Sequence, residues 1–296
     1  MPGLVEEGRA KVNLTLRVVG RRTDGYHDLA SVVAFADCAD KLTLTPGPEL
    51  SLKTVGPLAT ACGDLSDNLV LKAARLLAEV VPGLKAGAFE LAKVLPVAAG
   101  IGGGSADAAA ALRLLARLNN LSFDDERLQE VALEVGADVP VCLASRACDM
   151  TGVGEKLMPL NPPTMPAVLV NPCVPVATKD VFEALGLRHG ELLVGAADVM
   201  MEAASSWPDE GGSLEEWVEA LAAGTNDLEA PATRIQPAIG EVIAALNATN
   251  GAWLARMSGS GATCFAVYEN TADARRAADK VRLEHPSWWV HAGTLS

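Results

Sequence analysis

The segment LPVAAGIGGGSADAAAAL, Leu95 to Leu112, decides the fold prediction, because four glycines in five positions directly precede an alanine-rich helix. Glycine lets a bound group approach the backbone closely. Consecutive backbone amides at a helix N-terminus form an anion site without any side-chain cation. The segment therefore predicts a loop that binds phosphate and opens a helix over ADAAAALRLLARL, with Ser105 as a candidate cap.

Two familiar phosphate loops do not match this segment. A dinucleotide fingerprint needs G-x-G-x-x-G, but Ser105 occupies the position of the last glycine. A P-loop needs a lysine before the Ser or Thr at the helix start, and none is present. The alternatives that stay open are a cradle made of backbone amides and a plain glycine turn before a well-packed helix.

The composition is that of a globular protein. The chain has 296 residues, is 50% hydrophobic and carries a formal net charge of -13. That charge disfavours nucleic acid and anionic membranes as partners, and no apolar stretch reaches the roughly 20 residues of a membrane span. No secretory signal is visible, so a cytoplasmic location is expected. The six cysteines and four histidines lack zinc or disulfide spacing, which indicates free, mostly buried thiols.

Hydrophobic periodicity predicts the local structure. Residues 10–19 (AKVNLTLRVV) alternate as one half-buried strand, with Lys11 and Asn13 on its polar face. Val139 precedes Pro140, which favours an extended or loop conformation around Asp138. The remaining predicted strands are 29–36, 41–45, 87–94, AVLVN (167–171), TCFAVY (263–268) and SWWVHAG (287–293), and the remaining predicted helices are Asn68–Val80, 125–135 with Gly136 as its stop, several within 179–248, and ADARRAADKVRL (272–283).

A cluster of prolines marks a predicted domain boundary. The run PLNPPTMP at 159–166 has four prolines in eight residues, a composition typical of linkers. We therefore predict two domains, 1–160 and 161–296. The β-α-β order at the end of the chain fits an α+β domain.

Three motifs together carry a family resemblance. They are AKVNLTL at 10–16, PVAAGIGGGSADAAAAL at 96–112 and RMSGSGATCFAVY at 256–268. In this order the chain resembles the small-molecule kinases of the GHMP superfamily. The resemblance implies a two-domain α+β fold. Its N-terminal mixed α/β domain, which binds the nucleotide, would be like domain 2 of ribosomal protein S5, its C-terminal domain would be ferredoxin-like, and the active site would lie in the cleft between them.

Further segments resemble one branch of that superfamily. These are AKVNLTLRVVGRRTDGYHDL (10–29), SDNLV (66–70), the G-I-G-G-G-S form of the loop, and GADVPVCL (136–143). The branch phosphorylates the 2-hydroxyl of a methylerythritol chain that carries a cytidine diphosphate group, on the methylerythritol phosphate route to isoprenoids. The rival predictions are another superfamily kinase acting on homoserine, mevalonate or a sugar, a dinucleotide-dependent oxidoreductase, and a non-catalytic nucleotide-binding module.

The resemblance also implies roles for single residues. Asp138 would be the general base that takes the proton of the acceptor hydroxyl. Lys11 would be its partner, would keep that carboxyl ionised, and would stabilise charge on the alkoxide and the phosphoryl group. Asn13 lies two residues further along the strand and would hydrogen-bond the erythritol chain. From local sequence alone, Asp138 could equally be a turn residue and Lys11 a solvated edge-strand lysine.

The base of the acceptor needs an aromatic face and a group that reads its edge. Tyr26 could stack on a cytosine ring and His27 could hydrogen-bond it, with Phe182 on the other side and Thr178 nearby. Gly259 and Ser260 of the third motif would contact the substrate. The alternatives are a Tyr–His pair that covers the core and a plain β-turn at residues 258–261.

The nucleotide would be ATP, as co-substrate together with Mg²⁺, and no direct protein ligand to the metal is predicted. Asn68 and Lys93 are predicted near the adenine-nucleotide end, although Asn68 could simply cap a helix and Lys93 could be a solvated strand residue. The chain is expected to be a monomer or a weak homodimer. Its expected partner is the small-molecule acceptor. The predicted ATP-binding residues are Pro96, Ala99, Gly100, Ile101, Gly102, Gly103, Gly104, Ser105, Ala106, Asn68 and Lys93.

Overall fold

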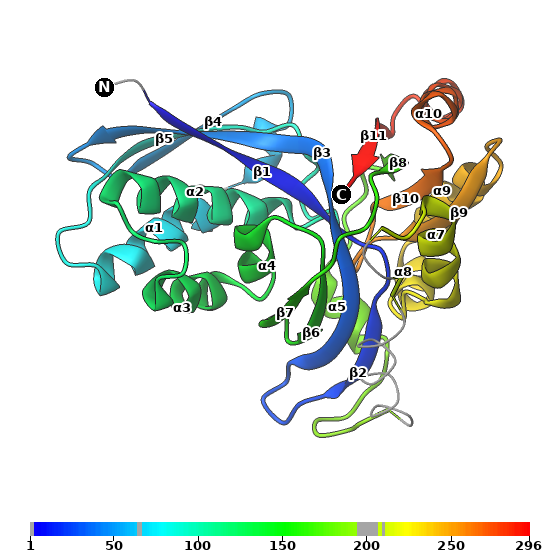
Figure 1. Ribbon diagram of the computed structural model, residues 1–296, viewed down its shortest axis with the longest axis horizontal. Coiled ribbons are helices and arrows are strands. Elements are labelled where there is room, and N and C mark those ends of the chain that lie inside the picture. Colours follow the sequence, from blue (N-terminus) through cyan, green and yellow to red (C-terminus); the bar gives the residue numbers. More distant parts are fainter. Residues whose placement is uncertain (1–2, 64–66, 194–206, 209–210) are drawn as a thin grey trace. The chain divides into compact units, whose positions relative to one another are not determined.

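The computed structural model describes residues 3–63, 67–193, 207–208 and 211–296 (Figure 1). The chain forms two compact units that interleave along the sequence. The first comprises Met1–Lys11, Cys38–Val97 and Gly102–Ser145, and the second comprises Val12–Asp37, Ala98–Ile101 and Arg146–Ser296. The glycine loop therefore passes from one unit to the other between Ile101 and Gly102. The division into domains at residue 160 stays a prediction.

The first unit places helices on one face of a small sheet, as Figure 1 shows. Strand β5 (Ala86–Ala92) pairs parallel with β4 (Ser51–Val55) and antiparallel with Lys41–Gly47, the C-terminal part of β3 (His27–Gly47). Strand β1 (Leu4–Asn13) also pairs with β3. The unit further contains the 3-10 helix η1 (Ala59–Cys62) and the helices α1 (Leu69–Val80), α2 (Gly103–Asn119), α3 (Glu126–Val135) and α4 (Val139–Ala144).

Small and aliphatic side chains let these helices pack closely. In α2 the run Ala108–Ala111 is fully buried, and α2 contacts α1, α3 and α4. The Asn68 side chain accepts a hydrogen bond from the Val70 amide at 3.0 Å and so begins α1. Asp125 caps α3 in the same way through the Arg127 amide. Helix α2 is thus packed among three neighbouring helices.

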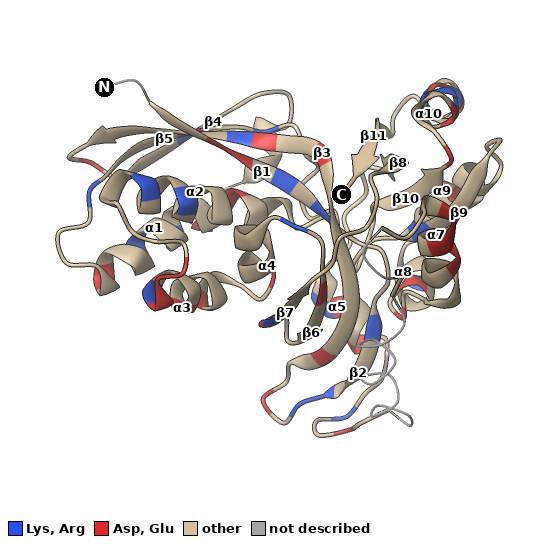
Figure 2. Ribbon diagram, in the orientation of Figure 1, with Lys and Arg blue, Asp and Glu red and all other residues tan. Residues whose placement is uncertain are grey.

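The second unit is built on antiparallel strands in the order β11, β8, β10, β9. Helices α9 and α10 pack on them around a core that includes Val168, Ala266 and Val281. The outer surface of α10 carries interspersed acidic and basic residues (Figure 2). The elements are β2 (Arg17–Arg21), β6 (Cys148–Gly152), β7 (Lys156–Pro159), β8 (Met165–Asn171), α5 (Thr178–Glu183), α7 (Leu214–Ala223), α8 (Glu229–Ile235), α9 (Ala238–Asn247), β9 (Ala252–Met257), β10 (Cys264–Tyr268), α10 (Thr271–Glu284) and β11 (Trp289–Leu295).

The predicted single strand at residues 10–19 is wrong in two respects. Strand β1 ends at Asn13 and β2 begins at Arg17. Its polar side is also buried, with Lys11 3%, Asn13 1% and Thr15 4% exposed. Buried polar groups need partners, and these residues have them: the Thr15 hydroxyl, for example, accepts from the Val32 amide at 3.1 Å. Alternation predicts which residues share a face but not whether that face meets water.

Two predictions at helix starts are also wrong. Helix α4 begins at Val139, directly after Asp138, because proline fits the first turn of a helix, where its missing N–H would have no partner. Helix α2 begins at Gly103 with Gly102 as its N-cap, so Ser105 lies inside the first turn and caps nothing. The strands predicted at 29–36 and 41–45 form one long strand, β3.

The other local predictions hold. The helices predicted at Asn68–Val80, 125–135 and 272–283 match α1, α3 and α10, and the predicted strands 87–94, 167–171, 263–268 and 287–293 match β5, β8, β10 and β11. The helical section predicted at 179–248 contains α5, α7, α8 and α9, and part of it lies outside the described residues. Within the described residues none of the six cysteines forms a disulfide, as predicted, but only Cys142, Cys148 and Cys264 are buried. No described helix is long and apolar enough to cross a membrane.

Candidate phosphate and acceptor sites

The glycine loop has the backbone geometry of a cradle. Gly100 and Gly102 have φ of 72° and 62°, in the left-handed region that glycine adopts without strain. Helix α2 follows, with no side-chain hydrogen bond at its N-cap. The first amides of a helix lack intrahelical acceptors, and the Ala106 amide is the one that bonds back to the Gly102 carbonyl, at 2.8 Å. The amides of residues 103–105 therefore begin a helix whose positive end faces the loop.

The first half of this loop lies against the third motif, within the second unit. The Ser258 hydroxyl donates to the Gly100 carbonyl at 3.0 Å, and the Thr263 amide donates to the Ala99 carbonyl at 3.0 Å. A Cβ at Gly100 would lie 2.5 Å from the Ser258 carbonyl oxygen, so this approach requires glycine. The two glycine-rich motifs, far apart in the sequence, thus pack against each other through residues 99–100 and 258–263.

The second half of the loop lies against Lys11, within the first unit. A Cβ at Gly102 would be 3.3 Å from Lys11 Cε. Lys11 Nζ donates to Asp138 Oδ2 at 3.0 Å, and the two side chains are 4% and 39% exposed. The thiol of Cys142, one turn further along α4, is buried, and that burial raises its pKa to about 12. The thiol therefore stays protonated at neutral pH, and it lies 3.7 Å from a Cβ placed at Gly102.

The residues predicted to read a base lie in the second unit. The rings of His27 and Phe182 stack with centroids 4.6 Å apart and an interplanar angle of 27°. Burial lowers the pKa of His27, with the charge of Arg21 adding to the effect, so the ring is neutral at pH 7. Within the part of the chain that the structure describes, His27 Nε2 has no hydrogen-bond partner. Tyr26 is 60% exposed in the turn just before His27.

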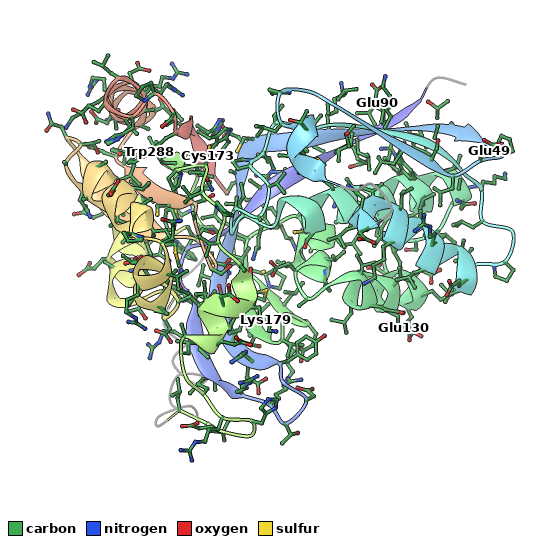
Figure 3. All side chains as sticks on the ribbon, turned by 180° about the vertical axis from the view of Figure 1, so that it is seen from behind. Glu49, Glu90, Glu130, Cys173, Lys179 and Trp288 are labelled. Atoms are coloured by element: carbon green, nitrogen blue, oxygen red, sulfur yellow. The ribbon has the colours of Figure 1, made fainter. Side chains whose placement is uncertain are left out.

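Two more predicted substrate residues, Thr178 and Asn13, lie next to Ser260 and Gly259 of the third motif. The Thr178 and Ser260 hydroxyls are 2.9 Å apart. The Asn13 amide group donates to the Ser31 hydroxyl at 2.7 Å, and its oxygen lies 3.3 Å from a Cβ placed at Gly259. Thr178 begins α5, the helix that also carries Phe182; Figure 3 labels its neighbour Lys179. The substrate roles of these residues stay predictions.

Lys93 and Asn68 take structural positions. The Lys93 ammonium is buried between Asp40 Oδ2 at 2.5 Å and Asp107 Oδ2 at 2.8 Å, and it is therefore no solvated strand residue. Asn68 caps α1, which was the structural alternative. Their predicted contacts with ATP stay predictions.

Sequence reasoning missed the residues that hold the third motif. Asn226 donates from its side-chain amide to the Met257 and Gly259 carbonyls, both at 2.8 Å. Glu229 accepts from the Met257 amide at 2.9 Å. The polar run N-D-L-E at 226–229 is the one signal that the sequence offers here, and no role followed from its letters. No signal in the sequence predicted that Asp40 and Asp107 would pair with Lys93.

Comparison with known proteins agrees with this architecture. The family model "GHMP kinases N terminal domain" matches residues 68–146, and "GHMP kinases C terminal" matches residues 200–286. A solved homoserine kinase from Cytophaga hutchinsonii superposes with a TM-score of 0.71 at 19% identity, covering 98% of this chain and 94% of that chain, which shows the shared fold. The chain belongs to the GHMP kinases, a family of two-domain, mixed α/β enzymes.

Relatives that match over nearly their full length are similar to this chain within one branch of the GHMP kinases. A 4-diphosphocytidyl-2-C-methyl-D-erythritol kinase of Bradyrhizobium diazoefficiens is 74% identical over 296 residues, covering 100% of this chain and 99% of the relative. A crystal structure of 4-(cytidine 5'-diphospho)-2C-methyl-D-erythritol kinase has a TM-score of 0.76 at 34% identity and covers 99% of each chain. The similarity to this kinase thus extends over both units.

Proposed function

We propose that the protein transfers the γ-phosphoryl group of ATP to the 2-hydroxyl of 4-diphosphocytidyl-2-C-methyl-D-erythritol, giving the 2-phosphate and ADP. The observation that carries the proposal is the Lys11–Asp138 ion pair against Gly102 of the glycine loop. It supplies a carboxylate and a cation at a helix N-terminus suited to phosphate. The relatives named for this reaction match the whole chain.

The phosphates of ATP bind the amides at the start of α2. The loop lacks a lysine of its own, so its backbone amides and the helix dipole provide most of the attraction. Lys11 adds the missing side-chain charge from β1, and its stem packs against Gly102. The contacts between Ser258 and Gly100 support the loop from the second unit.

Mg²⁺ fits this arrangement as a companion of the nucleotide. Kinases hold it through the substrate phosphates and one or two carboxylates, with waters completing the shell. Among the residues that the structure describes, no group of three or more His, Cys, Asp or Glu side chains is placed to hold a metal ion. When bound, Mg²⁺ neutralises charge on the phosphates.

Asp138 takes the proton of the acceptor hydroxyl, and that oxygen attacks the γ-phosphorus in line as the bond to the β-phosphate oxygen breaks. Lys11 holds the Asp138 carboxylate at 3.0 Å and balances the negative charge that develops. General-base catalysis of this kind contributes about 10²–10⁴-fold.

The cytosine of the acceptor binds the aromatic residues of the second unit. Tyr26 offers an exposed ring for stacking, and the His27–Phe182 pair offers a second aromatic surface. His27 Nε2, which lacks a partner within the described chain, hydrogen-bonds the edge of the base. Homoserine and mevalonate have no base for these groups. We further propose a cytoplasmic enzyme that is a monomer or a weak homodimer.

A coupled ADP-release assay over a panel of acceptors tests the function. The expected result is turnover with the cytidyl diphosphate ester and MgATP, and none above background with mevalonate, homoserine or a hexose. Turnover on one of those three, without turnover on the ester, would refute the substrate. A Tyr26→Ala variant separates base recognition from phosphate binding, since only the former should weaken.

A further inference from the structure

A buried ion triad lies beneath the phosphate loop in the first unit. Lys93 Nζ bridges Asp40 Oδ2 at 2.5 Å and Asp107 Oδ2 at 2.8 Å. The three side chains are 4%, 0% and 5% exposed. Burying three charges is costly, and ion pairs of this kind seldom add net stability over a well-packed apolar core. The triad therefore calls for a reason other than stability.

The triad connects the two ends of the glycine loop. Asp40 uses its second oxygen to accept from the Val94 amide at 2.6 Å and the Leu95 amide at 2.9 Å, where the chain leaves β5 and enters the loop. Asp107 lies on α2, where the chain leaves the loop. A Cβ at Gly103, the first residue of α2, would be 3.4 Å from Lys93 Nζ.

The surroundings leave the triad little freedom. A Cβ at Gly8 on β1 would lie 2.9 Å from Asp107 Oδ1, so only glycine there lets the strand pack on this carboxyl. Burial raises the pKa of Asp107 to about 7, opposed by Lys93 and reinforced by Asp40. Burial alone would lower the pKa of Lys93, but the two carboxylates outweigh it and leave that pKa raised. Lys93 therefore keeps its charge.

We propose that the Lys93–Asp40–Asp107 triad is a positioning device that fixes both ends of the phosphate loop, so that Lys93 acts on ATP through its carboxylate partners and does not contact the nucleotide. A loop with four glycines loses much conformational entropy when it is ordered. Amides that are already aimed at the phosphates bind without that loss. The proposal rests on the proposed ATP-dependent function and revises the predicted contact of Lys93 with ATP.

The test compares Lys93→Met, Asp107→Asn and the double variant. The control is Lys53→Met, because Lys53 pairs with Glu90 at 3.5 Å on the neighbouring strands β4 and β5, and both side chains are exposed (Glu90 is labelled in Figure 3). The measurements are KM for ATP, KM for the cytidyl ester, kcat, and the affinity for adenylyl imidodiphosphate with Mg²⁺ by calorimetry.

If the triad positions the loop, its variants should weaken the binding of ATP but not of the ester, and they should do so through the same effect. Lys93→Met is expected to raise the KM for ATP and the analogue Kd about tenfold, and Asp107→Asn several-fold, with KM for the ester unchanged. The double variant should be no worse than Lys93→Met alone, because both substitutions disable one device. Lys53→Met should match the wild type.

Two outcomes would overturn the proposal. If Asp107→Asn binds the analogue like the wild type while Lys93→Met does not, Lys93 acts on the nucleotide directly. If Asp107→Asn and Lys93→Met are both folded and both bind normally, the triad does not position the loop. Should Lys93→Met fail to fold, Asp107→Asn decides, since its amide oxygen still accepts from Lys93. Analogue binding needs no acceptor, so a failure of the substrate assignment leaves this test standing.

Discussion

Replacing Asp138 by asparagine is expected to lower kcat by about 10²–10⁴-fold, the usual contribution of a general base. That loss corresponds to about 3–5 kcal/mol in the activation barrier. The substitution preserves shape and leaves an amide oxygen that can accept from Lys11 Nζ, now 3.0 Å from Asp138 Oδ2. It removes the charge that would take the hydroxyl proton.

The cost to folding is expected to be much smaller. Lys11 is buried but Asp138 is 39% exposed, so water already screens one side of the pair. With the hydrogen bond retained, the free energy of unfolding should fall by about 1–2 kcal/mol at most. Asp138→Ala provides the matched control, because it loses both the base and the hydrogen bond. It should show a similar loss of kcat and a larger loss of stability.

The assay is ADP release at saturating ATP and cytidyl ester, with thermal unfolding and analogue calorimetry on the same preparations. Near-normal kcat in Asp138→Asn would show that another group takes the proton. A Kd for the ATP analogue that rises as much as kcat falls would show that Asp138 serves nucleotide binding and not proton transfer. Either result would refute the mechanism derived from the Lys11–Asp138 pair.

Three further predictions concern other parts of the two units. Tyr26→Ala should raise the KM for the ester about tenfold and leave the KM for ATP unchanged, whereas equal increases in both would contradict base stacking. Gly100→Ala, at φ 72° and with its Cβ 2.5 Å from the Ser258 oxygen, should lower the free energy of unfolding by about 2 kcal/mol or more. Gly104→Ala, whose Cβ meets only Leu69 at 3.6 Å, should be neutral or stabilising in denaturant titration, and equal losses in the two alanine variants would contradict the close approach. Burial raises the pKa of Asp149 to about 6, so the folded state holds this proton more tightly than the unfolded chain, and this residue's contribution to stability should fall as pH rises from about 4 to 6. Thermal unfolding of Asp149→Asn should show a smaller decline in stability between about pH 4 and 6. A pH dependence equal to that of the wild type would contradict the raised pKa of Asp149.

Many elements of the fold could be predicted from the sequence because their signals are local, although the strands β4, β6, β7 and β9 were not predicted. Asn68 before an apolar 3.6-residue repeat indicates a helix start, and Gly136 after residues 125–135 indicates its end. The errors lie where tertiary contacts override local preference. Lys11, Asn13 and Thr15 suggest a wet strand face, but each has an internal hydrogen-bond partner and is buried. The error at Pro140 is a local one, because proline restrains Val139 but also fits the first turn of a helix, and α4 begins there.

From the sequence one could predict a glycine loop at a helix N-terminus, with Lys11, Asp138 and an aromatic group elsewhere in the chain as candidate site residues. The loop follows from residue types and their order, whereas the roles of Lys11, Asp138 and the aromatic residues are implied by the resemblance to the GHMP kinases. What these residues contact depends on the packing of the folded chain. Lys11 lies against Gly102 of the loop LPVAAGIGGGSADAAAAL and bonds Asp138, 127 positions away along the chain. The same packing places Lys93 between Asp40 and Asp107. Such pairings depend on which side chains the packed strands and helices bring together, and that information is not local to any segment.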